Sequence, residues 1–324
     1  MMKNRFLFVA MLFVALSLGF VSCDNKGNKS DDPATEQGGS TENSGSEEET
    51  QTPDPGEGEG GSSDDSSSNL VPDAFSVSAD KQVYFSPGNL QYIRSSDTWQ
   101  FASCQWKRVG TDNVTGGMLT SDGEHGYSCE GTALADKVDL FGWSTSRTNF
   151  GVSTSTDLDD YRGSFVDWGT NQVGNDAPNT WRTLTYDEWN YLRNSRPNAS
   201  SLRGVAQVNG VNGLILLPDG WSCPDGVTFK SGFHDRWGVD YYDAYQTFTA
   251  AEWSKMEVAG AVFLPAAGGR RGSGVYRVKH LGYYWSATEN SSYDASCLYF
   301  YSLEAYMSNS GREYGRSVRL VKDL

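Results

Sequence analysis

Residues 281–324 read LGYYWSATENSSYDASCLYFYSLEAYMSNSGREYGRSVRLVKDL, and we expect the rest of the chain to be organised around them. The two ends, GYYW and SVRLV, alternate apolar and polar side chains as half-buried β-strands do. The residues between them are rich in Tyr, Ser, Asn, Asp and Gly. Tyrosine offers a large contact area at low entropic cost, and the small polar residues adapt their hydrogen bonds. The composition therefore predicts a contact surface built on a fixed scaffold.

Alternation sorts this stretch into inward and outward positions. The apolar members Leu298, Phe300, Val318 and Leu320 are predicted to face inward. For any single tyrosine, packing against the other strands is an equally good interpretation, so the hypothesis concerns the group. The candidate ligand-binding residues are the positions predicted to face outward, with those of the preceding loop: Asn290, Ser291, Tyr293, Asp294, Ser296, Tyr299, Tyr301, Glu304, Tyr306, Ser308, Asn309, Glu313, Tyr314 and Arg316.

The beginning of the chain has the pattern of an export signal. Lys3 and Arg5 precede the apolar run FLFVAMLFVALSLGFV, which ends just before Cys23. The run is short for crossing about 30 Å of hydrocarbon, and no Lys and Arg cluster follows it. LGFVSC resembles a bacterial lipobox, which implies a signal peptide over residues 1–22 and lipidation of Cys23. The alternative is a cleaved secretory peptide with an incidental cysteine.

Residues 23–70 are predicted to form an acidic, Ser- and Gly-rich linker without a core. Residues 24–70 contain no aromatic residue, Ile or Val, so they cannot bury enough apolar surface to offset chain entropy. They hold thirteen acidic residues and two lysines, so most of the formal net charge of −15 lies here. The acidity therefore describes the linker and says little about the ligand. Asp31 and Asp32 resemble the acidic surface-export signals of Bacteroides-type lipoproteins, which implies an outer-membrane lipoprotein facing the cell exterior.

Residues 71–324 are long enough for one large domain and contain all ten tryptophans. Two segments are predicted to be helices, because Thr185 with Glu188 and Thr249 with Glu252 have the spacing of capping boxes. The remainder is typical of short strands and turns, such as those in KQVYFSP, NLQYI, TWQFA, GLILLP and AVFLPA. Two helices among many irregular strands predict an α+β fold whose loops are fixed by buried indoles.

A series of motifs carries a family resemblance over nearly all of residues 74–322. The motifs are FSVSADKQVYFSPGNLQY, VDLFGWSTS, VDWGTNQV, TWRTLTYDEWNYL, NGVNGLILLPDGW, AGAVFLPAAGGR, GYYWSAT and SVRLV. They resemble the Bacteroides lipoprotein group related to the Fibrobacter succinogenes major paralogous domain, with a C-type lectin-like or formylglycine-generating-enzyme-like fold. This resemblance implies two helices, long loops, many short antiparallel strands, chain ends meeting on a sheet, and a ligand-facing C-terminal surface.

The run 289–316 is similar to the C-terminal regions that retroelement-driven mutagenesis of adenines diversifies in related proteins. Asn, Ser, Tyr, Asp, Gly, Ala and Cys are all reachable from an asparagine codon by changing adenines. Glu304, Met307 and Glu313 are not reachable in this way. The resemblance therefore implies a variable binding region, and these three residues speak against active diversification.

The residues that most often carry enzyme chemistry are scattered along the sequence. Besides Cys23 there are Cys104, Cys129, Cys223 and Cys297, with no CxxC pair, and three disulfide connectivities are open to them. His125, His234 and His280 have no metal-ligating partner at close spacing. Asp157, Asp159 and Asp160 lack the EF-hand spacing and suggest a solvated turn. Asp235, Asp240 and Asp243 are spread through a Gly- and Tyr-rich loop. The calcium and sugar motifs of C-type lectins are absent from the sequence. The segment GGRRGSG (268–274) is interpreted as a turn. In that turn Arg270 and Arg271 could line the binding face.

We therefore expect a surface-displayed lipoprotein whose C-type lectin-like domain recognises a protein or glycan through its C-terminal face. Its membrane contact is expected through acylated Cys23, and no catalytic residue, cofactor, metal or nucleic-acid partner is expected. One alternative is a structural subunit of a cell-surface assembly, although an obligate interface usually has an apolar core. The other is a formylglycine-generating-enzyme-like oxidase, which the cysteine spacing disfavours.

Overall fold

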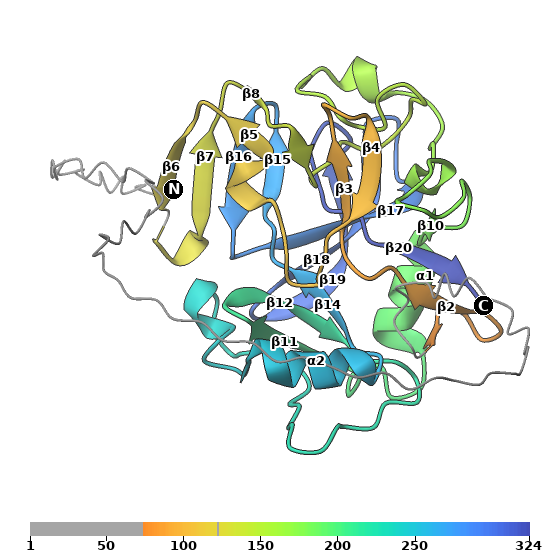
Figure 1. Cartoon of the computed structure of the whole chain (residues 1–324), viewed down its shortest axis with the longest axis vertical. Helices are drawn as coiled ribbons and strands as arrows, with labels where there is room; N and C mark the ends of the chain where they lie inside the picture. Colours follow the sequence, from red (N-terminus) through yellow and green to blue (C-terminus); the bar gives the residue numbers. More distant parts are fainter. Residues whose placement is uncertain (1–73, 122) are drawn as a thin grey trace, which may run out of the picture. The chain divides into compact units, whose positions relative to one another are not determined.

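Strands from both ends of the described chain lie side by side in one sheet (Figure 1). The computed structural model describes residues 74–121 and 123–324, which belong to one compact unit. The sheet has the order β1 (Phe75–Ser76), β2 (Gln82–Phe85), β20 (Leu320–Asp323), β10 (Arg182–Thr183), and every pair in it is antiparallel. The expected meeting of the two ends of the globular part is confirmed. The predicted signal peptide and linker, residues 1–70, lie outside the described residues.

Five further sheets complete the strand content of the described residues. Apart from the parallel pair β11 and β13, their strands run antiparallel. In sheet order the strands are β13 (Thr247–Phe248), β11 (Arg203–Val208), β12 (Val211–Leu216) and β14 (Val262–Pro265); β15 (Gly269–Arg271), β16 (Gly274–Val278), β7 (Tyr127–Glu130) and β6 (Met118–Ser121); β17 (Gly282–Glu289), β18 (Asp294–Tyr301) and β19 (Glu304–Gly311); β4 (Thr98–Phe101), β3 (Leu90–Ile93) and β9 (Lys137–Val138); and β5 (Val114–Thr115) with β8 (Ala133–Leu134).

The two α-helices of the described residues begin where the sequence predicts them. Helix α1 (Tyr186–Asn190) is capped by Thr185 and α2 (Ala250–Val258) by Thr249, each through a complete capping box. A wide π-helical turn, Tyr191–Ser195, extends α1. In α2, Trp253 and Met256 pack on the sheet that contains β11 and β12, along which the helix lies in Figure 1. The mixed, strand-rich α+β class is therefore confirmed.

Strands β17 and β18 form a wall between two cores. Because successive side chains alternate across a strand, Tyr284, Leu298 and Phe300 enter the core that also contains Trp189 of α1. Trp285 and Cys297 point the opposite way, into a second core. The predicted inward positions Leu298, Phe300, Val318 and Leu320 are all at most 1% exposed. This confirms the alternation at those positions.

Buried tryptophans tie the loops to these strands. The indole N–H of Trp143 donates to the carbonyl of Ser286 at 2.9 Å, and that of Trp285 donates to the carbonyl of Phe141 at 2.7 Å. The indole of Trp168 donates to Phe150 O at 2.8 Å. A buried indole combines a large apolar area with one directional donor, so each ring fixes a loop as well as filling space. The expected role of the tryptophans is confirmed at these three positions.

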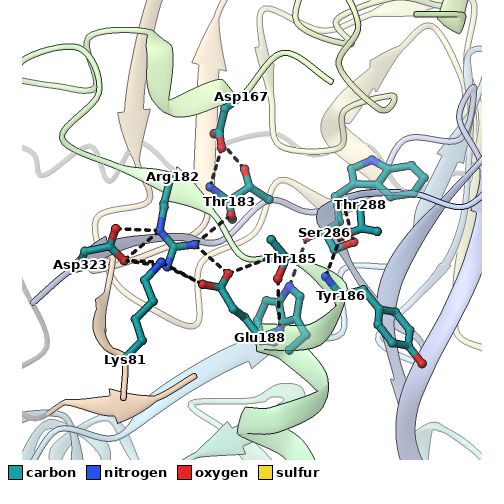
Figure 2. Close-up of polar contacts among 12 residues, drawn as sticks. Lys81, Asp167, Arg182, Thr183, Thr185, Tyr186, Glu188, Ser286, Thr288 and Asp323 are labelled. Carbon is teal, nitrogen blue, oxygen red and sulfur yellow. Dashed lines mark hydrogen bonds and ion pairs between the residues drawn. The ribbon is translucent and has the colours of Figure 1, made fainter. Parts of the chain in front are cut away.

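An ion cluster fastens the sheet of the chain ends to α1 (Figure 2). Arg182 of β10 contacts Glu188 of α1 at 2.7 Å and Asp323 of β20 at 2.7 Å. Lys81, just before β2, reaches the same two carboxylates at 3.2 and 3.4 Å. Glu188 also accepts a hydrogen bond from the backbone N–H of Thr185, so one carboxylate serves both the cap and the cluster.

Candidate functional site

The strand register gathers tyrosines on one face of the β17–β18–β19 sheet. Tyr283 lies opposite Tyr299, which in turn lies opposite Tyr306 on β19. Tyr301 pairs with Glu304 at the end of β18. Tyr283, Tyr299 and Tyr301 are partly exposed, and Tyr306 is 36% exposed. Towards the other end of the same face of the sheet, Trp285 and Cys297 are buried in the second core. The tyrosines therefore lie on the part of this face that extends beyond that core.

Six tyrosines contact one another or a shared arginine here. The ring centroids of Tyr283 and Tyr299 are 4.8 Å apart, those of Tyr299 and Tyr301 5.4 Å, and those of Tyr299 and Tyr306 5.0 Å. Tyr276 of β16 and Tyr314 add a second pair at 6.3 Å. We call the surface formed by these residues the tyrosine face: Tyr276, Tyr283, Tyr299, Tyr301, Tyr306 and Tyr314.

Arg316 supports the tyrosine face from inside. Its guanidinium carbon lies 3.6 Å from the ring centroid of Tyr283, with Tyr276 and Tyr314 at 5.8 and 5.0 Å. It donates to the hydroxyl of Tyr276 at 2.9 Å and to Ser310 Oγ at 2.9 and 3.1 Å. Aromatic faces attract a desolvated cation, so the rings stabilise its charge. This contact network holds the rings of Tyr276, Tyr283 and Tyr314 around one guanidinium.

The expectation that Arg316 faces outward is wrong, since the residue is only 6% exposed. It follows β19, where the chain leaves that strand and forms a backbone bridge to Phe141 instead. The period-two pattern of β19 therefore does not extend to this position. An arginine is long enough to turn its charged end back between the tyrosine rings.

Two other expected surface positions are also buried. Ser296, 4% exposed, shares the inward face of β18 with Leu298 and donates to Asn309 Oδ1 at 3.1 Å. Glu313 is likewise 4% exposed, in the turn after β19, and contacts the exposed Arg271 at 3.5 Å. The prediction of outward orientation is wrong for both residues. Ser296 is two residues from the buried Leu298, so its side chain lies on the same buried face of β18. Glu313 lies in the turn after β19, which directs its side chain towards the interior.

The remaining candidates divide among three places. Glu304 and Ser308 lie along the tyrosine face, and Glu304 accepts a hydrogen bond from Tyr301 at 2.6 Å. Asn309 is exposed on the opposite side of β19. The hairpin positions 290–294 stand at the far end of β18, roughly 23 Å from Tyr301 at about 3.3 Å per residue. There, Asn290 and Ser291 are exposed beside the half-buried Asp294. The single continuous surface that the sequence predicts is therefore divided.

The hairpin has its own aromatic contact. Tyr293, 39% exposed, lies under the guanidinium of Arg162, 4.8 Å from the ring centroid, and its hydroxyl accepts a hydrogen bond from the same arginine. Arg162 follows the turn that contains Asp157, Asp159 and Asp160. These three carboxylates are exposed, as the interpretation as a solvated turn requires.

Sequence reasoning missed two members of the tyrosine face. Tyr276 lies on β16, just before the C-terminal stretch begins, and no local signal marks it. Tyr283 could have been found, because alternation within GYYW places it opposite the buried Tyr284. Of the segment GGRRGSG, only Gly272 and Ser273 form the predicted turn, because residues 269–271 belong to β15 and Gly274 begins β16. Of its two arginines, Arg271 is exposed with its guanidinium 5.3 Å from the Tyr314 ring, whereas Arg270 is fully buried, so the suggestion that Arg270 lines the face is wrong.

Five phenols of the tyrosine face, those of Tyr276, Tyr283, Tyr299, Tyr301 and Tyr306, stay protonated at neutral pH. Burial raises the pKa of Tyr276 to about 12 and raises those of Tyr283, Tyr299 and Tyr306 above the ordinary value. The hydrogen bond to Glu304 raises the pKa of Tyr301 to about 12. A protonated phenol both donates and accepts hydrogen bonds. The face therefore offers ring surfaces and neutral hydroxyl donors.

Cysteines and histidines occupy other parts of the described chain. Cys104, Cys129, Cys223 and Cys297 are all free, and Cys129 and Cys297 share one core. Burial raises the pKa of the Cys297 thiol to about 11. His125 and His280 are not scattered as expected, because folding places their rings 5.8 Å apart with Trp237 4.5 Å from each. Within residues 74–121 and 123–324, no group of three or more His, Cys, Asp or Glu is placed to hold a metal ion.

The described residues define a strand-rich α+β domain with a partly exposed tyrosine and arginine surface. No family model, curated protein or solved structure matches the chain. Among the helices of the described residues, none is long and apolar enough to cross a membrane.

Proposed function

We propose that this protein is a lipid-anchored binding protein of the bacterial cell surface. In this proposal the domain has the C-type lectin-like fold, and its tyrosine face recognises a protein or glycan partner. The observation that carries the proposal is the partial exposure of six interlocked tyrosine rings around the buried Arg316. The N-terminal motif around Cys23 and the acidic segment 24–70 supply the proposed anchor and tether.

Recognition would rest on preorganised aromatic surface. The rings already touch at 4.8 to 5.4 Å within the Tyr283, Tyr299, Tyr301 and Tyr306 group. Side chains that are ordered before association lose little entropy when a partner binds. Exposed edges and hydroxyls can pack on apolar partner groups and hydrogen-bond to carbonyls or sugar hydroxyls, and tyrosine and arginine are the usual hot-spot residues of interfaces.

The proposal is tested with the purified full-length chain on arrays of immobilised glycans and immobilised outer-membrane proteins. The key variant is Tyr301→Ser with Tyr306→Ser, which removes two of the more exposed rings and leaves Arg316 and its contacts in place. The matched control is Tyr186→Ser on α1, which removes a ring of similar exposure, 38%, outside the face.

We expect the wild type and the control to bind the same array member and the double variant to lose at least about tenfold in affinity, since interface hot spots commonly contribute 2 kcal/mol or more, as roughly estimated from alanine scans. Equal binding by the double variant would remove the tyrosine face as the site. No binding of the wild type to either array would remove protein or glycan recognition.

A further inference from the structure

A cavity that does not include the tyrosine face lies beside strands β3 and β4. Its volume is about 630 Å³, within the range typical of small-molecule sites. The side chains of a strand alternate between its faces, so Gln91 and Gln100 border this cavity while Tyr92 and Trp99 lie on the other side of the sheet. The lining residues are Gln91, Gln100, Ser103, Lys107, Arg108, Val109, Asp112, Ala135, Asp136 and Lys137.

Arg108 is the unusual group in this cavity. Its Nε is buried and makes no hydrogen bond, and no atom of the described residues accepts one from its guanidinium. The residue as a whole is half-buried, and burial lowers the pKa of its guanidinium because the charged form is less well solvated there. Buried polar groups nearly always have partners, so the unpaired Nε is a donor that the fold leaves available.

The nearest acid does not fill this role. Asp139 is fully buried and attracts Arg108 electrostatically, but its two oxygens already accept bonds from Val109 N and Asn113 Nδ2, both at 2.7 Å. Asp136 of the cavity wall is also engaged, because it accepts from Ser95 N at 2.7 Å and Ser95 Oγ at 3.0 Å. Arg108 therefore has a counter-charge that accepts none of its N–H groups.

The other donors of the cavity point to the same chemistry. Lys107 and Lys137 add two ammonium groups, and only the Lys107 group has a side-chain partner, Ser103 Oγ at 2.8 Å. The acids near these three cations are Asp112 and the engaged Asp136 of the cavity wall, together with the buried Asp139 that attracts Arg108. A guanidinium fork matches the two oxygens of a carboxylate, sulfate or phosphate.

We propose that the cavity at Arg108 is a second binding site, which takes a small ligand carrying a carboxylate, sulfate or phosphate group. The guanidinium would hold two oxygens of that group, with Lys137 and the Gln91 amide as neighbouring donors. This site is independent of the tyrosine face, and its test does not depend on the partner proposed above.

The test follows the Arg108 side-chain N–H signal by NMR in the full-length chain while sodium acetate, sulfate or phosphate is titrated at constant ionic strength. We expect a saturable shift in the millimolar range with at least one of these anions. The anion that saturates distinguishes a carboxylate from a sulfate or phosphate ligand. Binding measured by calorimetry should weaken about tenfold or more in Arg108→Gln and stay unchanged in the control Lys255→Gln, which removes a lysine of α2 that does not line the cavity.

Two results would overturn the proposal: no saturable shift with any of the three anions, or equal affinity in Arg108→Gln. If Arg108→Gln fails to fold, Lys137→Gln replaces it, because Lys137 is exposed and its loss leaves the core intact. That variant should bind the same anion several-fold more weakly, and an unchanged affinity would equally count against the site.

Discussion

The guanidinium of Arg316 lies over the ring of Tyr283 at 3.6 Å, so a residue that follows β19 supports the first strand of the same sheet. Tyr283 also contacts Tyr299 of β18, with the two ring centroids 4.8 Å apart. The arginine is therefore connected through Tyr283 to the tyrosine of the neighbouring strand. A cation held among rings is less hydrated than one in water and is attracted more strongly to them. We infer that the order of the tyrosine face depends on this arginine.

Replacing Arg316 with lysine should lower the free energy of unfolding by about 2 kcal/mol, the scale of lost charge-assisted hydrogen bonds and ring stacking. Lysine keeps the charge but cannot reproduce the two contacts with Ser310 together with that to Tyr276. Urea denaturation measures the change. Arg147→Lys, on an exposed arginine, serves as the control, and equal stability of the two variants would refute the supporting role.

The ion cluster predicts a pH-dependent effect for Glu188→Gln. Partial burial alone would raise the pKa of Glu188, but hydrogen bonds from Arg182 and the Thr185 backbone hold it below its ordinary value. A lowered folded pKa contributes stability above the unfolded pKa of about 4.3, and that contribution is lost as pH falls through the folded pKa.

At neutral pH we therefore expect Glu188→Gln to cost about 1 to 2 kcal/mol, the scale of hydrogen bonds to charged groups. The difference from wild type should shrink as pH falls below about 4.3, where the unfolded carboxylate takes up a proton, and should be lost as pH passes through the lower folded pKa. Denaturation across pH measures this, with the exposed Asp225→Asn as control. A difference that stays constant down to acidic pH would contradict the lowered pKa.

Glu304 should control the ionisation of Tyr301. The carboxylate accepts a hydrogen bond from the phenolic hydroxyl at 2.6 Å and thereby stabilises the protonated form of Tyr301. In Glu304→Ala the pKa of Tyr301 should fall from about 12 toward the ordinary value of about 10. Carbon NMR of labelled tyrosine follows the titration. The pKa should stay raised in Asp225→Ala, and an unchanged pKa in Glu304→Ala would show that the contact does not exist in solution.

Cys23 should carry the membrane anchor. Metabolic labelling with a fatty acid should mark the wild-type protein, and Cys23→Ala should abolish the label, because the thiol is the proposed acylation point. Cys223→Ala, which removes an exposed cysteine of the domain, is the matched control and should stay labelled. Protease treatment of intact cells then reports the side of the membrane on which the domain lies. A labelled Cys23→Ala protein would show that another residue carries the lipid.

Features that depend on near neighbours were predictable. The capping boxes at Thr185 and Thr249 follow from residues three apart, and the inward positions Leu298 and Phe300 follow from strict alternation within one strand. In each case the determining contact lies within a single element, so the sequence pattern and the geometry share one period. The prediction became wrong at Arg316, where the strand had ended and alternation no longer applied.

By itself, the sequence determined the α+β class, both helix starts and the concentration of tyrosines near the C-terminus, because local propensity and periodicity encode them. Only the tertiary structure decided that Tyr276 joins the tyrosine face, that the hairpin around Tyr293 stands apart from it, and that Arg108 is left without an acceptor. Each of these depends on residues distant in sequence. Their encounter is fixed by how the sheets pack, and no local pattern records that packing.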